Sequence, residues 1–286
     1  MNGIHWEWRV SSDGGESFSE PRRILTSNSS RLYYTNIRRQ LVPKDGQAIE
    51  RFFFAAYDHP LNSGDHIVRG ALIDANGYLT DLEGARLGPN LFSNDCLFDI
   101  SSLPVVYSPA PGRTVRLLAV SITEPLRIGL CTFSPDCSDG EYIVASYHDG
   151  VWTTSEPFAK DVGFLGRQTM RDGSQSYVGG FEFYYGVGTA GLKPSMPAPV
   201  QTDGLYAARR RQDGRYVLEL YSSHDAGKTY RLEQEISVAP EGQKIWRPIV
   251  PVYAQDNMPV YWHEGYYEAH TGGWHCDVIM PVEYDN

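Results

Sequence analysis

The chain has 286 residues, a formal net charge of −10 and 13% aromatic residues, with 19 Tyr, 28 Gly and 18 Pro. This composition favours many short strands and turns over helices. The acidic balance argues against general nucleic-acid binding, which needs a basic stripe, and no window approaches the ~18 apolar residues of a membrane span. We therefore expect one all-β domain over residues 1–286, with no nucleic-acid or membrane partner.

Two segments follow the Asp-box pattern Ser-x-Asp-x-Gly-x-Ser/Thr-aromatic, one at residues 11–18 and one at residues 223–230. In this pattern the Asp accepts hydrogen bonds from backbone N–H groups of its own turn, and the Gly adopts a backbone geometry closed to other residues. The aromatic residue is expected to lie under the hairpin. Because such turns join the two outer strands of a propeller blade, we expect Asp13 and Asp225 to be structural.

The first residues, Met1 to Arg9, lack the basic-then-apolar order of a secretory signal. The segment Trp6 to Val10 already predicts a strand that runs into the first Asp-box. If the chain is complete as written, we expect it in the cytoplasm. If it is a mature or trimmed form, and lacks N-terminal blades, we expect it to be secreted or periplasmic.

Apolar runs separated by turn residues follow at the ~8–12-residue spacing of an antiparallel sheet. The predicted strands are Leu32 to Ile37, Arg51 to Tyr57, His66 to Asp74, Leu103 to Tyr107, Val115 to Ile122, Tyr142 to His148, Val151 to Ser155, Tyr177 to Tyr185, Gly204 to Arg211, Tyr216 to Ser222, Arg231 to Ile236, Ile249 to Tyr253, Pro259 to His263 and His275 to Pro281. They predict a β-propeller of about five blades of antiparallel sheet with Asp-box hairpins, in which the segment before Pro21 completes or abuts the last sheet.

Four cysteines are too few for a disulfide scaffold. Cys131 and Cys137 flank a short turn-like segment, so we expect them to lie close together. They form either a hairpin disulfide, two ligands of a structural zinc to which His275 and Cys276 contribute, or plain thiols. Since no Cys-x-x-Cys pair is present, no cofactor is expected, and a structural zinc or calcium ion has no support from residue spacing.

Three consecutive arginines end the predicted strand Gly204 to Arg211. Because strand residues alternate between faces, Arg209 and Arg211 share one face and Arg210 lies on the other. A solvated edge strand with basic residues is the simplest explanation.

Six motifs occur in an order that is recognisable across most of the chain from about Leu32: residues 53–60 (FFAAYDHP), 70–77 (GALIDANG), 177–181 (YVGGF), 205–209 (LYAAR), 247–251 (RPIVP) and 259–266 (PVYWHEGY), with the second Asp-box between the fourth and fifth. In this order the chain resembles the Asp-box (BNR) repeat proteins related to ulvan lyases and rhamnose–glucuronate lyases. Those proteins are β-propeller polysaccharide lyases.

The resemblance implies a catalytic set of His59, Tyr177 and Arg209. It also implies a lyase that cleaves a uronic-acid-containing polysaccharide by β-elimination, with an acidic polysaccharide or oligosaccharide as partner. Two departures stand against it. Residues 186–203 lengthen the loop between the Tyr and the Arg, and the family's other, more N-terminal His has no counterpart in the strand Tyr34 to Arg38.

The chemistry of β-elimination suits these residue types. The C5 proton beside a carboxylate is a weak acid until the carboxylate is neutralised, which an Arg does bidentately. A Tyr or His then serves as the base. We therefore expect the three side chains to converge at one end of the propeller axis, with His66, Asn36, Arg38 and Arg247 binding substrate at the same mouth. Tyr177, His59 and Arg247 could equally serve packing.

Two other functions fit the sequence. One is a non-catalytic carbohydrate-binding propeller that has lost the catalytic set. The other is a sialidase-like glycoside hydrolase, although an Arg-Ile-Pro motif near the start and an Arg triad with a Tyr–Glu nucleophile pair are not identifiable.

Overall fold

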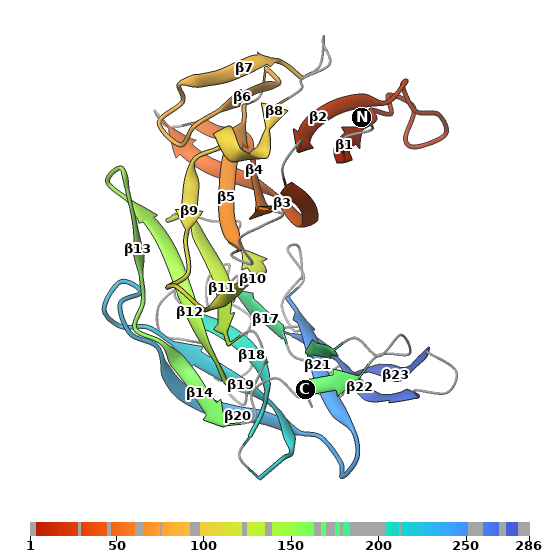
Figure 1. The fold of residues 1–286 in the computed structure, drawn as a ribbon, viewed down its shortest axis with the longest axis vertical. Helices are drawn as coiled ribbons and strands as arrows, with labels where there is room; N and C mark the ends of the chain where they lie inside the picture. The colour runs from red at the N-terminus through yellow and green to blue at the C-terminus, as the bar shows by residue number, and fades with distance from the viewer. Residues whose placement is uncertain are drawn as a thin grey trace. The chain divides into compact units, whose positions relative to one another are not determined.

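The computed structural model describes residues 4–27, 30–44, 47–60, 66–74, 76–91, 98–121, 125–134, 139–162, 167–169, 175–177, 180–183, 204–211, 213–250, 260–268 and 273–279. These residues form β-strands and one short 3-10 turn, and they contain no α-helix (Figure 1). None of the described segments is a helix that could span a membrane. Contacts within the chain divide it into two compact units, unit 1 (Met1–Leu117, Ser121–Leu126 and Tyr147–Trp152) and unit 2 (Leu118–Val120, Arg127–Ser146 and Thr153–Asn286).

Unit 1 contains two sheets. The larger has the strand order β3 (Ser30–Lys44), β4 (Gln47–Pro60), β5 (Ile67–Ile73), β6 (Tyr78–Thr80) and β7 (Arg86–Asn90), and β9 (Val105–Tyr107) pairs with β5. The smaller joins β1 (Ile4–Trp8), β2 (Arg22–Ser27) and β8 (Phe98–Asp99), which precedes the 3-10 turn η1 (Ile100–Ser102). Buried side chains such as Phe54, Leu79 and Ile100 form the core of this unit.

Four further sheets follow. The first has the order β10 (Thr114–Val120), β11 (Arg127–Phe133), β12 (Asp139–His148) and β13 (Val151–Thr154), with β14 (Phe158–Val162) also on β12. The second is the four-stranded meander β17 (Gly180–Phe183), β18 (Gly204–Arg210), β19 (Tyr216–Ser222) and β20 (Arg231–Val238). The third is β21 (Lys244–Ile249), β22 (Tyr261–Glu268) and β23 (Gly273–Ile279), and β15 (Arg167–Thr169) and β16 (Gln175–Tyr177) form a separate pair.

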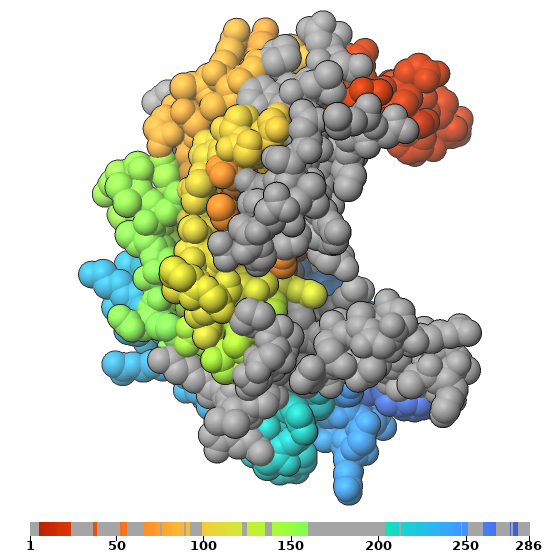
Figure 2. All heavy atoms as spheres, viewed as in Figure 1, coloured from red at the N-terminus to blue at the C-terminus, as the bar shows by residue number. Residues whose placement is uncertain are grey.

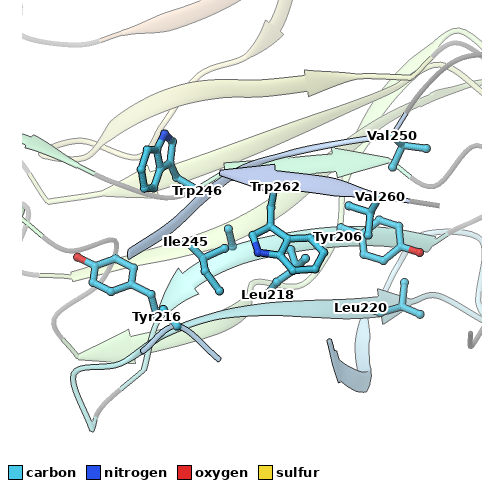
Figure 3. Packing of buried hydrophobic residues seen from close by; sticks show 11 residues of the cluster. Tyr206, Tyr216, Leu218, Leu220, Ile245, Trp246, Val250, Val260 and Trp262 are labelled. Atoms are coloured by element: carbon cyan, nitrogen blue, oxygen red, sulfur yellow. The ribbon is translucent and has the colours of Figure 1, made fainter. Parts of the chain in front are cut away.

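Two strands of the meander, β18 and β19, bury side chains on both faces against neighbouring sheets of unit 2. Leu205, Ala207 and Tyr221 on one face pack with residues of β11, β12 and β14. On the other face, Tyr206, Leu218 and neighbouring residues pack with Ile245, Trp262 and other residues of the last sheet (Figure 3). Alternation along β18 and β19 thus produces two apolar faces, and consecutive sheets stack as propeller blades do.

Both Asp-box turns join antiparallel strands and make the hydrogen bonds that the pattern predicts. Asp225 accepts from the backbone N–H and the hydroxyl of Thr229 at 2.8 and 2.6 Å, between β19 and β20. Asp13 accepts in the same way from Ser17, between β1 and β2. The aromatic residues differ: Tyr230 is buried in the core, whereas Phe18 is 60% exposed, so the expected packing under the hairpin holds only for the second turn.

The predicted fold class is therefore confirmed: the chain is all-β, and its antiparallel sheets are built like propeller blades with Asp-box hairpins. The N-terminal segment does not complete the last sheet, because β1 pairs with β2 and β2 pairs with β8; that it abuts the last sheet stays a prediction. The number of blades, and a single domain over residues 1–286, stay predictions.

The predicted cysteine pair falls partly outside the described residues, which do not include Cys96 and Cys137. Cys131 is a buried thiol that donates weakly to the Thr132 carbonyl at 3.8 Å and lies in the core between two sheets. Cys276 lies on β23 opposite Gly265 of β22. Among the described residues, no three His, Cys, Asp or Glu side chains gather as a metal site would require.

Candidate functional site

The predicted site residues are divided between the two units. His59, His66, Asn36 and Arg38 belong to unit 1, and Tyr177, Arg209 and Arg247 belong to unit 2. The expected convergence of His59 with Tyr177 and Arg209 requires residues of both units to meet. It stays a prediction.

In unit 1 the predicted residues lie on three successive strands or beside them. His59 is near the end of β4 opposite Arg31, and Asn36 lies on β3 opposite Ala55. The side chains of these two are outside the described part of the structure. Arg38 is half-buried on β3 opposite Phe53. His66 precedes β5 and is half-buried, with its Nδ1 3.4 Å from the Val115 carbonyl oxygen.

In unit 2, Tyr177 ends β16 and pairs with Arg167 of β15, and Arg247 lies within β21. The side chains of both are outside the described residues. Arg247 is followed by Pro248, and the register of β21 against β22 shifts between Trp246 and Ile249. A proline within a strand commonly accompanies such an irregularity, so Arg247 lies in an irregular part of the strand.

The side chain of Arg209 is fully described, and it forms a bidentate ion pair. Its Nε lies 2.6 Å from Glu219 Oε2 and its Nη2 lies 2.9 Å from Oε1. Register explains the pair, since Glu219 faces Ala207 across the β18–β19 ladder and Arg209 is two residues further along the same face. Only 12% of the Arg209 side chain and 2% of the Glu219 side chain are exposed.

Tyr221 completes this buried cluster, because its hydroxyl donates to Glu219 Oε2 at 2.7 Å. Burial raises the pKa of the Tyr221 hydroxyl, with Arg209 opposing that rise. Burial alone would lower the pKa of Arg209, but its bonds with Glu219 and the influence of Tyr221 outweigh burial, and the pKa of the guanidinium is raised. Arg209 is therefore a permanent cation held against an internal carboxylate.

A tyrosine–glutamate pair of this kind was not apparent from sequence. The sequence feature that could have revealed it is Glu219, the single acidic residue in the apolar strand Val217 to Tyr221, which lies two positions before Tyr221 and therefore on the same face of the strand. Both side chains are at most 4% exposed, and Tyr221 packs on Phe158 with ring centroids 5.2 Å apart. A nucleophile must reach its substrate, so this pair is placed to stabilise the stacking of two sheets.

A groove opens at the opposite face of the same meander, with a volume of about 830 Å³. It lies between the turn that joins β18 to β19 and the loop that joins β20 to β21, and these two segments project side by side at the surface in teal and blue (Figure 2). Its lining residues are Arg210, Asp213, Gly214, Arg215, Tyr216, Val238, Ala239, Pro240, Glu241, Gly242, Gln243 and Lys244. Three of these are cations and two are carboxylates.

The turn on one side of the groove is held by its own hydrogen bonds. Gly214 N–H donates to the Arg211 carbonyl at 2.9 Å, and Asp213 Oδ1 accepts from the Arg215 N–H at 3.0 Å. Asp213 also pairs with the guanidinium groups of Arg211 and Arg215, and Arg211 pairs with Glu235 as well. The charges of these two arginines are therefore matched by carboxylates beside them.

Arg210 points to the groove, on the face opposite Arg209, as strand alternation predicts. Its Nε donates to the Gly214 carbonyl at 3.2 Å, and within the described residues no carboxylate pairs with it. Gly214 has a φ of +86°, and a Cβ there would lie 3.3 Å from Arg210 Nη2. The backbone conformation favours glycine here, and a Cβ would also require the Arg210 side chain to shift by a few tenths of an ångström.

Tyr216 and Lys244 form the inner part of the groove, where it meets the hydrophobic core. The Tyr216 ring is buried at the end of the apolar cluster, and its hydroxyl points away from that cluster (Figure 3). Burial raises the pKa of Tyr216 to about 12, with Arg210 opposing that rise. Lys244 Nζ lies 5.8 Å from the Tyr216 ring centroid, and the pKa of this lysine is lowered by burial and then by the charge of Arg210.

No family model and no curated protein sequence matches this chain. Among solved structures, it is similar to Trypanosoma rangeli sialidase in complex with the inhibitor DANA, at a TM-score of 0.38 and 12% identity, over 96% of this chain and 43% of that one. The same sialidase in complex with sialic acid gives a TM-score of 0.36 at 12% identity, over 93% of this chain and 37% of the other.

A second similar structure is the fucose-specific lectin from Aleuria aurantia, at a TM-score of 0.30 and 13% identity, over 90% of this chain and 81% of the lectin. The chain spans about two fifths of the length of the sialidase chains. At these TM-scores and identities, neither similarity transfers a family, a site or an activity to this chain.

Proposed function

We propose that this chain is a non-catalytic carbohydrate-binding protein, and that Arg209 serves its fold and not a chemical step. The observation that carries the non-catalytic part of the proposal is the bidentate contact of Arg209 with Glu219. In a lyase the corresponding arginine has to neutralise the carboxylate of a uronate. Here Nε and Nη2 are already held by a carboxylate of the chain itself, and Nη1 is buried.

The energetic argument supports the same conclusion. A substrate carboxylate that used Nε and Nη2 would have to displace Glu219, which is 2% exposed and would remain charged in the core. Removing one partner of a buried ion pair costs about 3–5 kcal/mol. Saccharide binding has no such requirement, because hydroxyl groups and ring faces are recognised by polar and aromatic side chains of an open groove.

Elimination and binding are separable by experiment. The chain is incubated with a panel of uronic-acid polysaccharides, and the absorbance of the unsaturated product is followed while retention of the chain on the same immobilised polysaccharides is measured. We expect retention on at least one polysaccharide and no product. Product that forms with the wild type and disappears with Tyr177→Phe would overturn the proposal in favour of the lyase that the motif order implies.

A matched control variant distinguishes loss of catalysis from loss of structure. Tyr147→Phe removes a hydroxyl from another aromatic residue of a strand, outside the predicted catalytic set. A lyase loses product with Tyr177→Phe and keeps it with Tyr147→Phe. Absence of both retention and product for the wild type would also contradict carbohydrate binding.

A further inference from the structure

We propose that the groove between the β18–β19 turn and the β20–β21 loop is a subsite for an anionic group of a saccharide, held between Arg210 and Lys244 beside Tyr216. The inference rests on the proposed carbohydrate binding and adds to it a place and a ligand class. The ligand chemistry is a carboxylate or sulfate group carried on a sugar.

The distribution of charge around the groove carries this inference. Arg211 and Arg215 are matched by Asp213 and Glu235 at the outer side of the turn. Arg210 instead turns to the groove with its Nε on the Gly214 carbonyl, and no carboxylate of the described residues pairs with it, so its guanidinium has donors to offer a ligand. An arginine in this arrangement presents a planar set of donors that suits a carboxylate or sulfate group.

Lys244 brings a second positive charge to the same groove from the next sheet. Two cations that line one groove repel each other, and the lowered pKa of Lys244 reflects burial and the nearby Arg210. An anion bound between them removes that repulsion. In a chain with a net charge of −10, three cations against two carboxylates give this groove a local excess of positive charge.

Tyr216 supplies a hydroxyl that can form a hydrogen bond with the sugar. Its ring lies at the border between the core and the groove, and its hydroxyl is directed away from the apolar cluster (Figure 3). This hydroxyl is protonated at neutral pH, since burial raises its pKa further above the ordinary value of 10, and it can donate to or accept from a sugar hydroxyl. Charge on one side and a hydroxyl on the other thus suit an acidic saccharide better than a simple inorganic anion.

The test is calorimetric titration of the full chain with three hexasaccharides: a glucuronic acid hexamer, a sulfated galactose hexamer and an uncharged glucose hexamer. Each is measured at low and at physiological salt with the wild type, Arg210→Gln, Lys244→Gln and Lys244→Arg. Arg231→Gln is the matched control, because Arg231 is exposed on β20 and does not line the groove. Urea unfolding of each variant confirms that it is folded.

We expect the wild type to prefer a charged hexamer, with affinity that falls as salt rises. Arg210→Gln and Lys244→Gln should each lose about tenfold or more for that hexamer, which corresponds to one charge-assisted hydrogen bond. Lys244→Arg and Arg231→Gln should bind like the wild type. A carboxylate ligand is distinguished from a sulfate ligand by which of the two hexamers binds.

Two results would overturn the inference, and they differ in what they say about carbohydrate binding. If the wild type binds the charged and uncharged hexamers equally, and both glutamine variants behave like Arg231→Gln, the subsite is wrong and carbohydrate binding stands. If the wild type binds none of the three hexamers and no polysaccharide of the panel, carbohydrate binding fails and the subsite fails with it.

Discussion

Arg209 shows how one residue type serves either chemistry or the fold, depending on its neighbour. The motif order implies a catalytic arginine, and the strand alternation that separates Arg209 from Arg210 could be predicted from sequence. What sequence could not reveal is the partner, because Glu219 meets Arg209 only through the register of β18 against β19. The partner decides whether the guanidinium is available to a ligand.

The Arg209–Glu219 pair predicts a characteristic pattern of stabilities. Arg209→Met and Glu219→Leu should each destabilise the chain by about 3–5 kcal/mol, because each leaves one charge buried and unpaired. The double variant should cost clearly less than the sum of the two. Urea unfolding of the wild type, the single variants and the double variant measures this. Additive costs would show that the two side chains contribute independently and would contradict a coupled pair.

Asp225 gives the second Asp-box a predictable pH dependence. Bonds from the hydroxyl and then the backbone of Thr229 lower the pKa of its carboxyl from 3.8 to about 2. Because the unfolded chain takes up this proton at a higher pH than the folded chain, the stabilisation is fully present above about pH 4 and is lost as the pH falls to about 2.

Thermal unfolding between pH 5 and pH 2 measures this effect. Asp225→Asn should lower the unfolding midpoint at pH 5, and the difference from the wild type should shrink towards pH 2. Glu241→Gln, on an exposed residue outside both Asp-boxes, is the control and should leave the profile of the wild type unchanged. A constant difference between Asp225→Asn and the wild type over the whole range would contradict the role of the ionised carboxylate.

At the scale of elements, most strands could be predicted, and the misses have identifiable causes. β11 (Arg127–Phe133) was missed because all seven of its residues are buried, so it lacks the alternation of a half-exposed strand. In addition, Cys131 of this strand was predicted to flank a short turn-like segment that ends at Cys137. β21 was predicted to begin at Ile249 but begins at Lys244, since Pro248 lies inside the strand where the register shifts. Turn chemistry at both Asp-boxes was predictable because it depends on local sequence alone.

The two glycines at the edges of the groove allow its backbone and its side chains to be tested separately. Gly214 and Gly242 have φ values of +86° and +79°, so alanine at either position is strained by about 1–2 kcal/mol. A Cβ at Gly214 would also lie 3.3 Å from Arg210 Nη2, whereas one at Gly242 would meet nothing within 4 Å.

Gly214→Ala and Gly242→Ala should therefore lose similar stability in urea unfolding, and only Gly214→Ala should also weaken binding of a charged hexasaccharide by displacing Arg210. Equal affinities for the two variants would show that the position of Arg210 does not matter to the ligand. If both variants were as stable as the wild type, the claim that alanine is strained at these two positions would be contradicted.

At the scale of the whole molecule, the fold class follows from features that repeat along the chain, whereas a site depends on how distant segments meet. Two hairpin turns and regularly spaced apolar runs predict an all-β chain of blade-like sheets, and the stacking of the meander β17 to β20 between two other sheets agrees with this. The groove was not predicted, because Arg210 and Lys244 are 34 positions apart and lie on different sheets.

The central claim is that the chain binds an acidic saccharide without cleaving it, and isothermal titration calorimetry with a uronic-acid oligosaccharide tests both parts at once. We predict heats that saturate with added ligand and a thermal power that returns to its baseline after every injection. A thermal power that stays displaced after each injection, with an unsaturated sugar in the cell at the end, would show continuing elimination and would contradict the claim.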